Sequence, residues 1–228
     1  MNINIGIIDY GMGNLRNVKN ALKFLGINSY ISRDTRELNK ADGLILPGVG
    51  AFYDAMQNLE KLEMDKFVVE QVKNNTPLLG ICLGMQVLFS EGHEVKFYQG
   101  LSLLEGRVVR FTRGLKIPHM GWNKLQFHFD NRNKGDFSSD IQLFDQKSKL
   151  LRNIPLGTFV YFVHSYYVSE CQGEHVIATA EYGRVFPAVV EKGNILGTQF
   201  HPEKSGDLGL KILNNYANFV REVKSNVD

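Results

Sequence analysis

Apolar and polar positions along the first half of the chain predict strands and helices in alternation. Apolar residues recur at three- and four-residue intervals from Leu15 to Leu25, which predicts a helix, and Gly26 follows as its stop. Residues 51–64 and 65–75 also have the pattern of helices. Short apolar runs between them predict buried strands, at residues 3–9, 43–48 and 77–82. This order predicts a mainly parallel sheet with helices on both faces.

The second half of the chain changes to closely spaced strand-like segments separated by turn residues. Five such segments are predicted, at residues 106–111, 157–168, 174–182, 186–193 and 194–200. We expect them to extend the parallel sheet with antiparallel or mixed pairing. An amphipathic helix is predicted at residues 207–223. The one poorly patterned stretch, residues 127–149, is rich in polar residues and predicts a surface loop or hairpin.

No linker and no repeat divides this pattern, so residues 1–228 are expected to form one domain. A chain of this length can bury a sizeable core within a single domain. The predicted fold is a flavodoxin-like α/β domain, with an open, mixed but mainly parallel sheet and helices on both faces.

The composition narrows the function mainly by what it excludes. A hydrophobic content of 43%, a charged content of 22% and a net charge of +2 are ordinary for a globular protein, and no basic run favours nucleic acid. No apolar stretch is long enough to cross a membrane. The N-terminal segment MNINIGIIDYG lacks the basic region and cleavage site of a signal peptide. With two cysteines in dissimilar contexts, we expect a cytoplasmic protein with reduced thiols.

Neither a metal nor a cofactor is predicted. The six histidines are scattered, without an H-E-x-x-H motif or a cysteine pair. Gly11 and Gly13 follow the first predicted strand, but Arg16 occupies the place of the third glycine of a dinucleotide-binding fingerprint. His119 and His164 are expected to be structural or to lie next to a substrate, with local hydrogen bonds.

The segment PLLGICLGMQVLF, residues 77–89, places a cysteine in a glycine-flanked corner. Its start predicts a strand and its end a helix, and Cys82 lies between Gly80 and Gly84. This is the layout of a nucleophile elbow, in which a sharp turn lifts a reactive side chain out of the sheet. The start of the following helix favours a thiolate. A buried packing cysteine is the alternative, and the choice between the two depends on a nearby base.

The segment GTQFHPEKS supplies a candidate base. His201 follows an apolar strand, and Glu203 lies two residues further on. In an extended chain, residues i and i+2 face the same side about 6.5–7 Å apart, so a carboxylate can reach back to an imidazole. Pro202 favours this extended conformation of the preceding residue. The pattern predicts a triad with Cys82. Local capping of a helix start by the acidic residue is the alternative.

Acyl transfer also needs hydrogen-bond donors for a developing oxyanion. The segment LPGVGAF ends a predicted strand in the turn Gly48-Val49-Gly50, where backbone N–H groups are free to point into a site. With the N–H of Leu83, directly after the candidate nucleophile, this turn predicts a two-donor oxyanion hole. A turn that needs glycine only for its shape would look the same.

Together these segments resemble a known family. GICLGMQ, TQFHPEKS and LPGVGAF are similar to motifs of the class I, triad-type glutamine amidotransferases. DYGMGNLRNV, KIPHMGWN and YFVHSYY narrow the resemblance to the glutaminase subunits of imidazole glycerol phosphate synthase, from histidine biosynthesis. The resemblance is collinear from about Ile5 to about Phe219, so it covers nearly the whole chain.

The resemblance implies an activity and gives each residue of the triad a role. Cys82 matches the nucleophile that attacks the side-chain amide of L-glutamine, forming a glutamyl thioester and releasing ammonia. His201 matches the base that activates the thiol and protonates the departing amine, and Glu203 matches its orienting carboxylate. The turn around Val49 matches the oxyanion loop.

The resemblance also implies where glutamine binds. Gln86 and Glu94 fall where the family contacts its substrate, although the segment FSEGHEVKFYQG departs from the acidic pair common there. Ser165 and Tyr166 fall where a strand backbone holds the α-amino-acid end of glutamine. Residues 127–150 inherit no role, because this stretch is longer than the family norm.

The chemistry implies a partner protein. Ammonia released into neutral water becomes ammonium, which is not nucleophilic, and nothing in this chain reads as an acceptor site. In the family the acceptor enzyme is a separate (β/α)8-barrel cyclase, which forms a heterodimer with the glutaminase. Asn14 and Trp122 lie in segments that resemble the docking face, and Trp is enriched among interface hot spots. Core packing is the alternative for Trp122.

Three other functions remain open at this point. A paralogous glutaminase would keep the same site and supply ammonia for amidation of a surface sugar. A thiol hydrolase of a related fold would cleave an ester or peptide without a partner. A non-catalytic binding subunit would keep the fold and make no use of Cys82.

Overall fold

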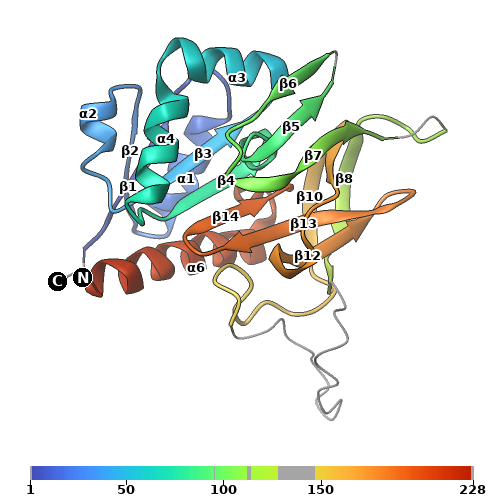
Figure 1. Ribbon diagram of the computed structural model, residues 1–228. Coiled ribbons are helices and arrows are strands. Elements are labelled where there is room, and N and C mark those ends of the chain that lie inside the picture. Colours follow the sequence, from blue (N-terminus) through green and yellow to red (C-terminus); the bar gives the residue numbers. More distant parts are fainter. Residues whose placement is uncertain (1, 95, 112–113, 128–146, 227–228) are drawn as a thin grey trace.

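An eight-stranded sheet forms the centre of the computed structural model, which describes residues 2–94, 96–111, 114–127 and 147–226 (Figure 1). Five neighbouring strands are parallel, in the order β2 (Asn28–Ser32), β1 (Asn4–Ile8), β3 (Gly43–Gly48), β4 (Leu78–Cys82) and β14 (Ile195–Thr198). Three antiparallel strands continue the sheet, namely β13 (Val185–Lys192), β12 (Val176–Glu181) and β9 (Gln126–Phe127). The mixed, mainly parallel α/β fold predicted from the sequence is confirmed.

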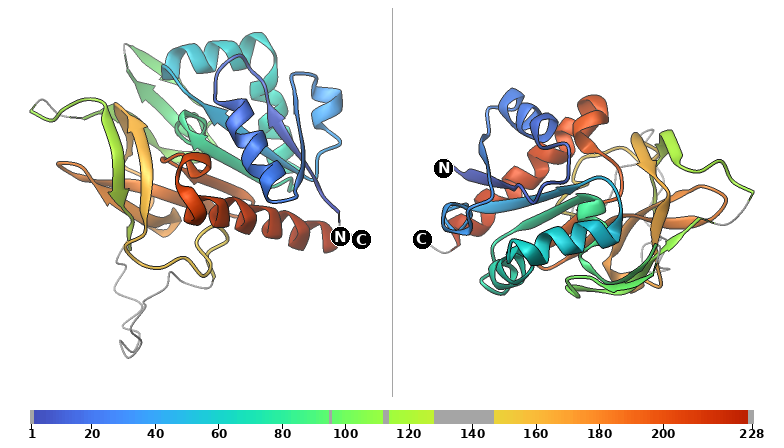
Figure 2. Two further views of the ribbon diagram at one scale, coloured as in Figure 1. Left: turned by 180° about the vertical axis from the view of Figure 1, so that it is seen from behind. Right: turned by 90° about the horizontal axis from the view of Figure 1, so that it is seen from above.

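Helices cover both faces of this sheet (Figure 2). One face carries α1 (Leu15–Phe24) and α6 (Gly206–Ser225), and the other carries α3 (Phe52–Lys61) and α4 (Met64–Lys73). Each helix packs an apolar stripe onto the sheet, as Leu22 does on the first face and Met56 on the second. The core is therefore two apolar layers, one on each side of the strands.

Two smaller sheets lie beside the central one and contain strands that we expected in the central sheet. A two-stranded sheet pairs β8 (His119–Lys124) with β10 (Phe159–His164), and a four-stranded sheet has the order β11 (Tyr166–Ser169), β7 (Leu104–Arg110), β5 (Phe89–His93) and β6 (Phe97–Gln99). The expectation that segments 106–111 and 157–168 extend the central sheet was therefore wrong. The second segment is divided at Ser165, since β10 pairs with β8 and β11 pairs with β7. Strand propensity predicts pairing but not the pairing partner, which packing selects.

The remaining elements are short: α2 (Thr35–Leu38), α5 (Leu83–Gln86) and the 3-10 turns η1 (Gly173–His175) and η2 (Pro202–Lys204). The helix predicted to run from Cys82 towards Phe89 was wrong in length, because it ends after one turn at Gln86. Val87 and Leu88 are fully buried. An apolar run this short does not distinguish a buried helix from a buried strand.

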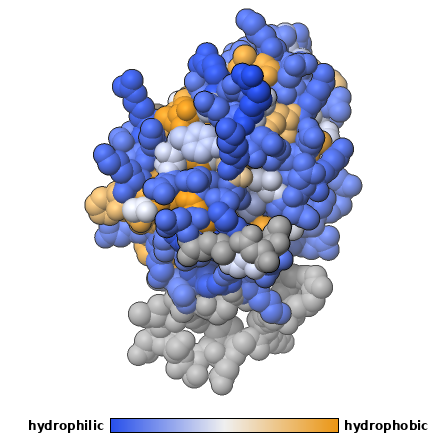
Figure 3. Space-filling model, turned by 90° about the vertical axis from the view of Figure 1, so that its left-hand side faces the viewer, coloured by the Kyte–Doolittle hydropathy of each residue, from blue (hydrophilic) through white to orange (hydrophobic). Residues whose placement is uncertain are grey.

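The predicted loop or hairpin at residues 127–149 falls mostly on residues 128–146, which lie outside the described residues. Beyond them the chain is attached to the central sheet, because Ser148 Oγ donates a hydrogen bond to Glu191 Oε1 at 2.8 Å. Within the described ranges no helix has the length and apolar character needed to span a bilayer. The face that carries the two termini is mainly hydrophilic, with apolar residues in small separate groups (Figure 3).

Candidate active site

Strand β4 ends at Cys82 in a sharp turn that leads directly into α5. The backbone angles of Cys82 are φ 56° and ψ −111°, a strained conformation of the kind found at functional sites. Both flanking glycines are required for this turn. A Cβ atom on Gly80 would lie 2.7 Å from the carbonyl oxygen of Gly84, and one on Gly84 would lie 1.7 Å from that of Leu46. The backbone thus has the geometry of a nucleophile elbow.

His201 follows β14 and is held firmly at its backbone. Its N–H donates to the carbonyl oxygen of Tyr161 at 3.0 Å, and its own carbonyl accepts from Ser205 Oγ at 2.7 Å. The ring atom Nδ1 lies 2.9 Å from Glu203 Oε1, and the two side chains are 2% and 0% exposed. η2 has no side-chain cap, so the carboxylate orients the imidazole and does not cap the turn.

Cys82 and His201 meet because β4 and β14 are adjacent parallel strands whose carboxyl ends emerge at one edge of the sheet. Burial disfavours the charged imidazole, but the interactions with Cys82 and Glu203 outweigh burial and raise the pKa of His201. Among the residues that the structure describes, none offers His201 Nε2 a hydrogen bond of standard geometry. The ring therefore has one nitrogen fixed by a carboxylate, while its other nitrogen remains available to the thiol.

The site is closed in this conformation. Cys82 is 5% exposed, as a packing cysteine would be, yet polar groups surround its sulfur. Sγ lies 3.8 Å from the carbonyl oxygen of Val163 and 3.8 Å from Nε2 of Gln199. A cysteine serving only to fill space would have apolar neighbours there, so these contacts favour a chemical role.

The glycine turn predicted as an oxyanion loop lies beside the elbow. Gly48 at the end of β3 is the register partner of Cys82 at the end of β4. Gly50 has φ +104°, a conformation that favours glycine, and Val49 between the two glycines is 41% exposed. Leu83 is the first residue of α5, so its N–H has no acceptor within the helix. The predicted turn thus begins next to the elbow, and the N–H of Leu83 directly follows Cys82 in the chain.

Gln86 is buried one turn after Cys82 and connects β11 with the segment that follows β14. Its Nε2 donates to the carbonyl oxygen of Tyr166 at 2.8 Å and to Oε1 of Gln199 at 2.9 Å. Ser165 lies at the junction of β10 and β11, where its carbonyl accepts from the N–H of Phe111 at 3.2 Å. The structure therefore brings Gln86 and the backbone of Tyr166 together.

Glu94 approaches the same region from β5. Its Oε2 accepts a hydrogen bond from the N–H of Phe52 at 2.5 Å, at the start of α3. Burial raises the pKa of Glu94, while this hydrogen bond acts in the opposite direction. The hydroxyl of Tyr166 donates to the backbone carbonyl of Glu94 at 3.4 Å. All four predicted substrate residues are therefore within one connected region of the fold.

Two residues near the sulfur were missed by the sequence analysis. Gln199 is fully buried beside Cys82 and lies directly after the end of β14. No signal in its sequence context identifies it. Tyr10 is 1% exposed, and its hydroxyl would lie 2.5 Å from a Cβ on Gly48. Nothing in its sequence context indicates this position.

The two predicted interface residues lie on β8 and directly before α1. Trp122 on β8 is 55% exposed, so core packing is excluded for it. Met120 and Phe159 are also exposed, on β8 and on its partner β10, and with Trp122 they form what we call the β8–β10 apolar surface. Asn14 precedes α1 and makes no side-chain capping hydrogen bond. In the described part of the chain, no group of three or more His, Cys, Asp or Glu could hold a metal ion.

Known proteins are similar to this chain over nearly its whole length. A sequence model of the family "Glutamine amidotransferase class-I" matches residues 6–218. The chain is 51% identical to the imidazole glycerol phosphate synthase subunit HisH of Geobacillus sp. (strain WCH70), over 95% of this chain and 97% of the relative. It is 49% identical to the subunit of the same name from Halalkalibacterium halodurans, over 96% of this chain and 97% of the relative.

Solved structures share the fold at much lower identity. The PurLQS structure from Thermotoga maritima superposes with a TM-score of 0.70 at 17% identity, covering 96% of this chain and 100% of that one. A crystal structure of a glutamine amidotransferase has a TM-score of 0.68 at 22% identity, covering 93% of this chain and 98% of that one.

Proposed function

The chain belongs to the class I glutamine amidotransferase family, and on this basis we propose that it is the glutaminase subunit of an imidazole glycerol phosphate synthase. Residues 1–228 would form its single amidotransferase domain. The observation that carries the proposal is the meeting of Cys82 at a strained elbow with the buried pair His201 and Glu203. The names of the curated relatives favour this pathway over amidation of a surface sugar.

The first half-reaction consumes the amide of L-glutamine. His201 Nε2 takes the thiol proton while Cys82 Sγ forms a bond to the amide carbon, whose oxygen becomes an oxyanion. The imidazolium formed in this step is stabilised by Glu203 at 2.9 Å, which is the usual role of the third group in a triad. His201 then protonates the amine, the C–N bond breaks, and ammonia leaves a glutamyl thioester behind.

The second half-reaction restores the enzyme. His201 removes a proton from water as the water oxygen attacks the thioester carbon. The C–S bond breaks, glutamate leaves, and the proton returns to the sulfur. The oxyanion forms again in this step, so the N–H groups of Val49 and Leu83 would serve both half-reactions, each donor contributing about 2.7–4 kcal/mol of barrier lowering.

Binding of glutamine is assigned to the connected region around Tyr166. The backbone of Ser165 and Tyr166 would receive the α-amino-acid end, with Gln86 and Glu94 completing the site. Cys82, Gln86 and His201 are buried, so glutamine must enter by movement of the surrounding segments. Such a closed site would keep water away from the thioester until the amine has left.

The acceptor of ammonia is a second protein in this proposal, a (β/α)8-barrel cyclase that forms a heterodimer with the chain. The β8–β10 apolar surface supports this, because three large apolar side chains are exposed together on two paired strands. Asn14 would lie at the same docking face. A biosynthetic complex of this kind implies a cytoplasmic location, with no cofactor and no metal in the glutaminase.

The test is release of glutamate and ammonia from L-glutamine by the purified chain, alone and with the cyclase encoded in the same genome. We expect slow hydrolysis alone, faster hydrolysis in the complex, and a loss of at least 10³-fold in Cys82→Ala. Absence of glutamine hydrolysis in the complex would refute the proposal.

Cys171 provides a matched control for the nucleophile. Burial raises the pKa of its thiol to about 11, so it remains protonated and unreactive near neutral pH. The glutamine analogue 6-diazo-5-oxo-L-norleucine should label Cys82 and leave Cys171 unmodified, and Cys171→Ala should retain full activity. Labelling of Cys171 in preference to Cys82 would contradict the assigned nucleophile.

A further inference from the structure

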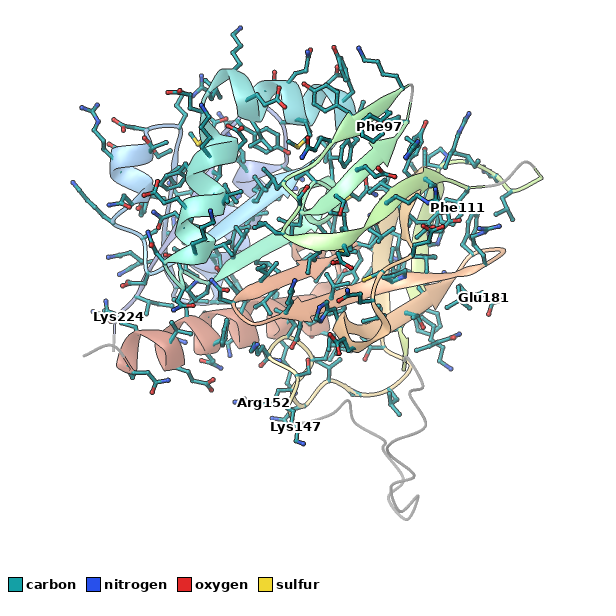
Figure 4. All side chains as sticks on the ribbon, in the orientation of Figure 1. Phe97, Phe111, Lys147, Arg152, Glu181 and Lys224 are labelled. Carbon is teal, nitrogen blue, oxygen red and sulfur yellow. The ribbon has the colours of Figure 1, made fainter. Side chains whose placement is uncertain are left out.

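Two buried histidines outside the triad form a direct contact at the end of the β8–β10 pair. His119 and His164 are register partners in the two strands, and His119 Nδ1 lies 3.0 Å from His164 Nε2. The proposed reaction assigns neither ring a role. Phe111, labelled in Figure 4, packs against both rings, with centroids 6.3 and 5.4 Å away.

The neighbours of the two rings fix every proton between them. His164 Nδ1 lies 2.8 Å from the carbonyl oxygen of Tyr166, which can only accept, so this nitrogen carries the proton. Burial lowers the pKa values of both rings, to about 4 for His119 and about 3 for His164, so both rings are neutral at pH 7. His164 Nε2 therefore accepts, and His119 Nδ1 donates to it.

This series of hydrogen bonds ends at Asn123, whose side-chain orientation is also determined. Asn123 Nδ2 donates to the carbonyl oxygen of Glu181 at 2.8 Å, and Asn123 Oδ1 accepts from the N–H of Lys124 at 2.7 Å. Nδ2 therefore also faces His119 Nε2, at 3.2 Å, as a donor. Glu181, whose carbonyl accepts the hydrogen bond from Asn123 Nδ2, is labelled in Figure 4. In this series of hydrogen bonds, from Asn123 to Tyr166, each donor faces an acceptor.

At Tyr166 this series of hydrogen bonds joins the residues around the nucleophile. The same carbonyl oxygen accepts from Gln86 Nε2, which also donates to Gln199 Oε1, and Gln199 Nε2 contacts Cys82 Sγ at 3.8 Å. Hydrogen bonds thus connect Asn123, next to the exposed Trp122, with the sulfur. Strand β8 contributes Met120 and Trp122 to the β8–β10 apolar surface on one face, and His119 and Asn123 to the hydrogen-bonded series on the other.

We infer that His119 and His164 are positioning residues, whose hydrogen bonds fix the carbonyl of Tyr166 and with it the backbone that receives the α-amino-acid end of glutamine. The inference rests on the proposed function. A neutral imidazole donor orients the carbonyl without bringing a charge next to the triad. Loss of that donor should weaken glutamine binding much more than it changes the reactivity of the thiol.

A purely structural role for His119 would require only its ring, which stacks between Phe162 and Tyr182 with centroids 5.0 and 4.2 Å away. His119→Phe keeps an aromatic ring but removes the donor. His119→Asn loses the ring but keeps an N–H group one bond beyond Cγ, where Nδ1 stands in histidine. The two variants therefore separate stacking from hydrogen bonding.

The experiment measures glutamine hydrolysis in the complex with the cyclase at saturating concentration, together with the melting temperature of each variant. We expect His119→Phe to raise KM about tenfold or more, to change kcat by less than threefold, and to melt near the wild-type temperature. His119→Asn should melt at a lower temperature but keep KM within threefold of wild type. An unchanged KM in His119→Phe, or a KM that follows melting temperature across both variants, would overturn the inference.

Two additions make the outcome decisive. Iodoacetamide, which has no α-amino-acid group, should alkylate Cys82 of His119→Phe at the wild-type rate, whereas 6-diazo-5-oxo-L-norleucine should react about tenfold more slowly. The variants His164→Leu and His164→Asn repeat the test at the residue that donates directly to the Tyr166 carbonyl. If His119→Phe does not fold, this second pair of variants tests the inference in its place. Failure of the wild-type complex to hydrolyse glutamine would refute the proposed function itself, which distinguishes that failure from an unchanged KM in active variants.

Discussion

Replacement of Glu203 by glutamine tests the triad without changing its shape. Glu203 Oε1 lies 2.9 Å from His201 Nδ1 in a fully buried pair. At an effective dielectric constant of 20, opposite unit charges 2.9 Å apart attract each other by about 6 kcal/mol. Glutamine keeps an acceptor oxygen but removes the charge that stabilises the imidazolium formed when Cys82 gives up its proton.

The expected effect on catalysis follows from this energy. Because about 1.4 kcal/mol corresponds to a factor of ten in rate, the full attraction corresponds to about 10⁴. Amide replacement of the acid in serine triads also lowers kcat by about 10⁴. We therefore expect Glu203→Gln to lower kcat by roughly 10³–10⁴, with KM for glutamine changed little because Glu203 does not reach the substrate region.

The assay is steady-state glutamate production by the complex, with Glu191→Gln as the matched control. Glu191 is also buried, but it lies on β13 and accepts hydrogen bonds from Ser148 Oγ and from the N–H groups of Lys149 and Leu150. Its replacement should weaken bonds to a charged group worth about 1.5–3 kcal/mol and leave kcat within threefold of wild type. A kcat for Glu203→Gln within tenfold of wild type would refute the triad.

The same variant should change the dependence of stability on pH. The pKa of His201 is raised in the folded protein, so the stability it contributes is fully present below the unfolded value near 6.5 and is lost as pH rises through the folded value. Glu203 is one of the groups that raise this pKa. In Glu203→Gln the alkaline loss of stability should therefore be smaller and should be complete at lower pH, which denaturant unfolding between pH 6 and 10 would measure.

Three further predictions concern the elbow, its surroundings and the buried imidazoles. Gly84→Ala places a Cβ 1.7 Å from the backbone oxygen of Leu46, so unfolding free energy should fall by about 3 kcal/mol or more and glutaminase activity should be lost, as urea unfolding and turnover would show. Tyr10→Phe removes a buried hydroxyl that has no partner among the described residues, so calorimetry should find the melting temperature unchanged or raised. The lowered pKa values of His119 and His164 make the folded protein lose stability as pH falls from about 6.5 towards 4, and His119→Phe should reduce this acid loss.

The central sheet could be predicted from the sequence because each of its elements has a local signal. The spacing of apolar residues predicted α1, and the helices predicted at 51–64 and 65–75 correspond to α3 and α4. The smaller sheets could not be predicted in the same way. Residues 157–168 have the pattern of one strand, and the change of sheet at Ser165 depends on strands that lie far away in the sequence. KIPHMGWN carries no alternation strong enough to identify β8.

The candidate site was predictable to the extent that its chemistry is written in short motifs. Cys82 between two glycines and His201 two residues before Glu203 could be found because both motifs are short, although Pro202–Lys204 forms a 3-10 turn and not the extended chain that we expected. Their meeting could not be derived from those motifs, since it depends on β14 pairing with β4 from the other end of the chain. Gln199 escaped notice because a buried amide has no sequence signal until its partner is known.

Three buried histidines of this protein show why residue type alone does not assign chemistry. His201 has a carboxylate at one nitrogen and a thiol near the other, and these raise its pKa despite burial. His164 has a neutral carbonyl at one nitrogen and the ring of His119 at the other, so burial prevails and its pKa falls. The first environment favours a group that accepts and returns a proton at neutral pH, and the second favours a permanent hydrogen-bond donor. The sequence predicted only that His201 is catalytic and that His119 and His164 are structural or lie next to a substrate. The hydrogen-bond partner of each ring nitrogen explains this difference physically.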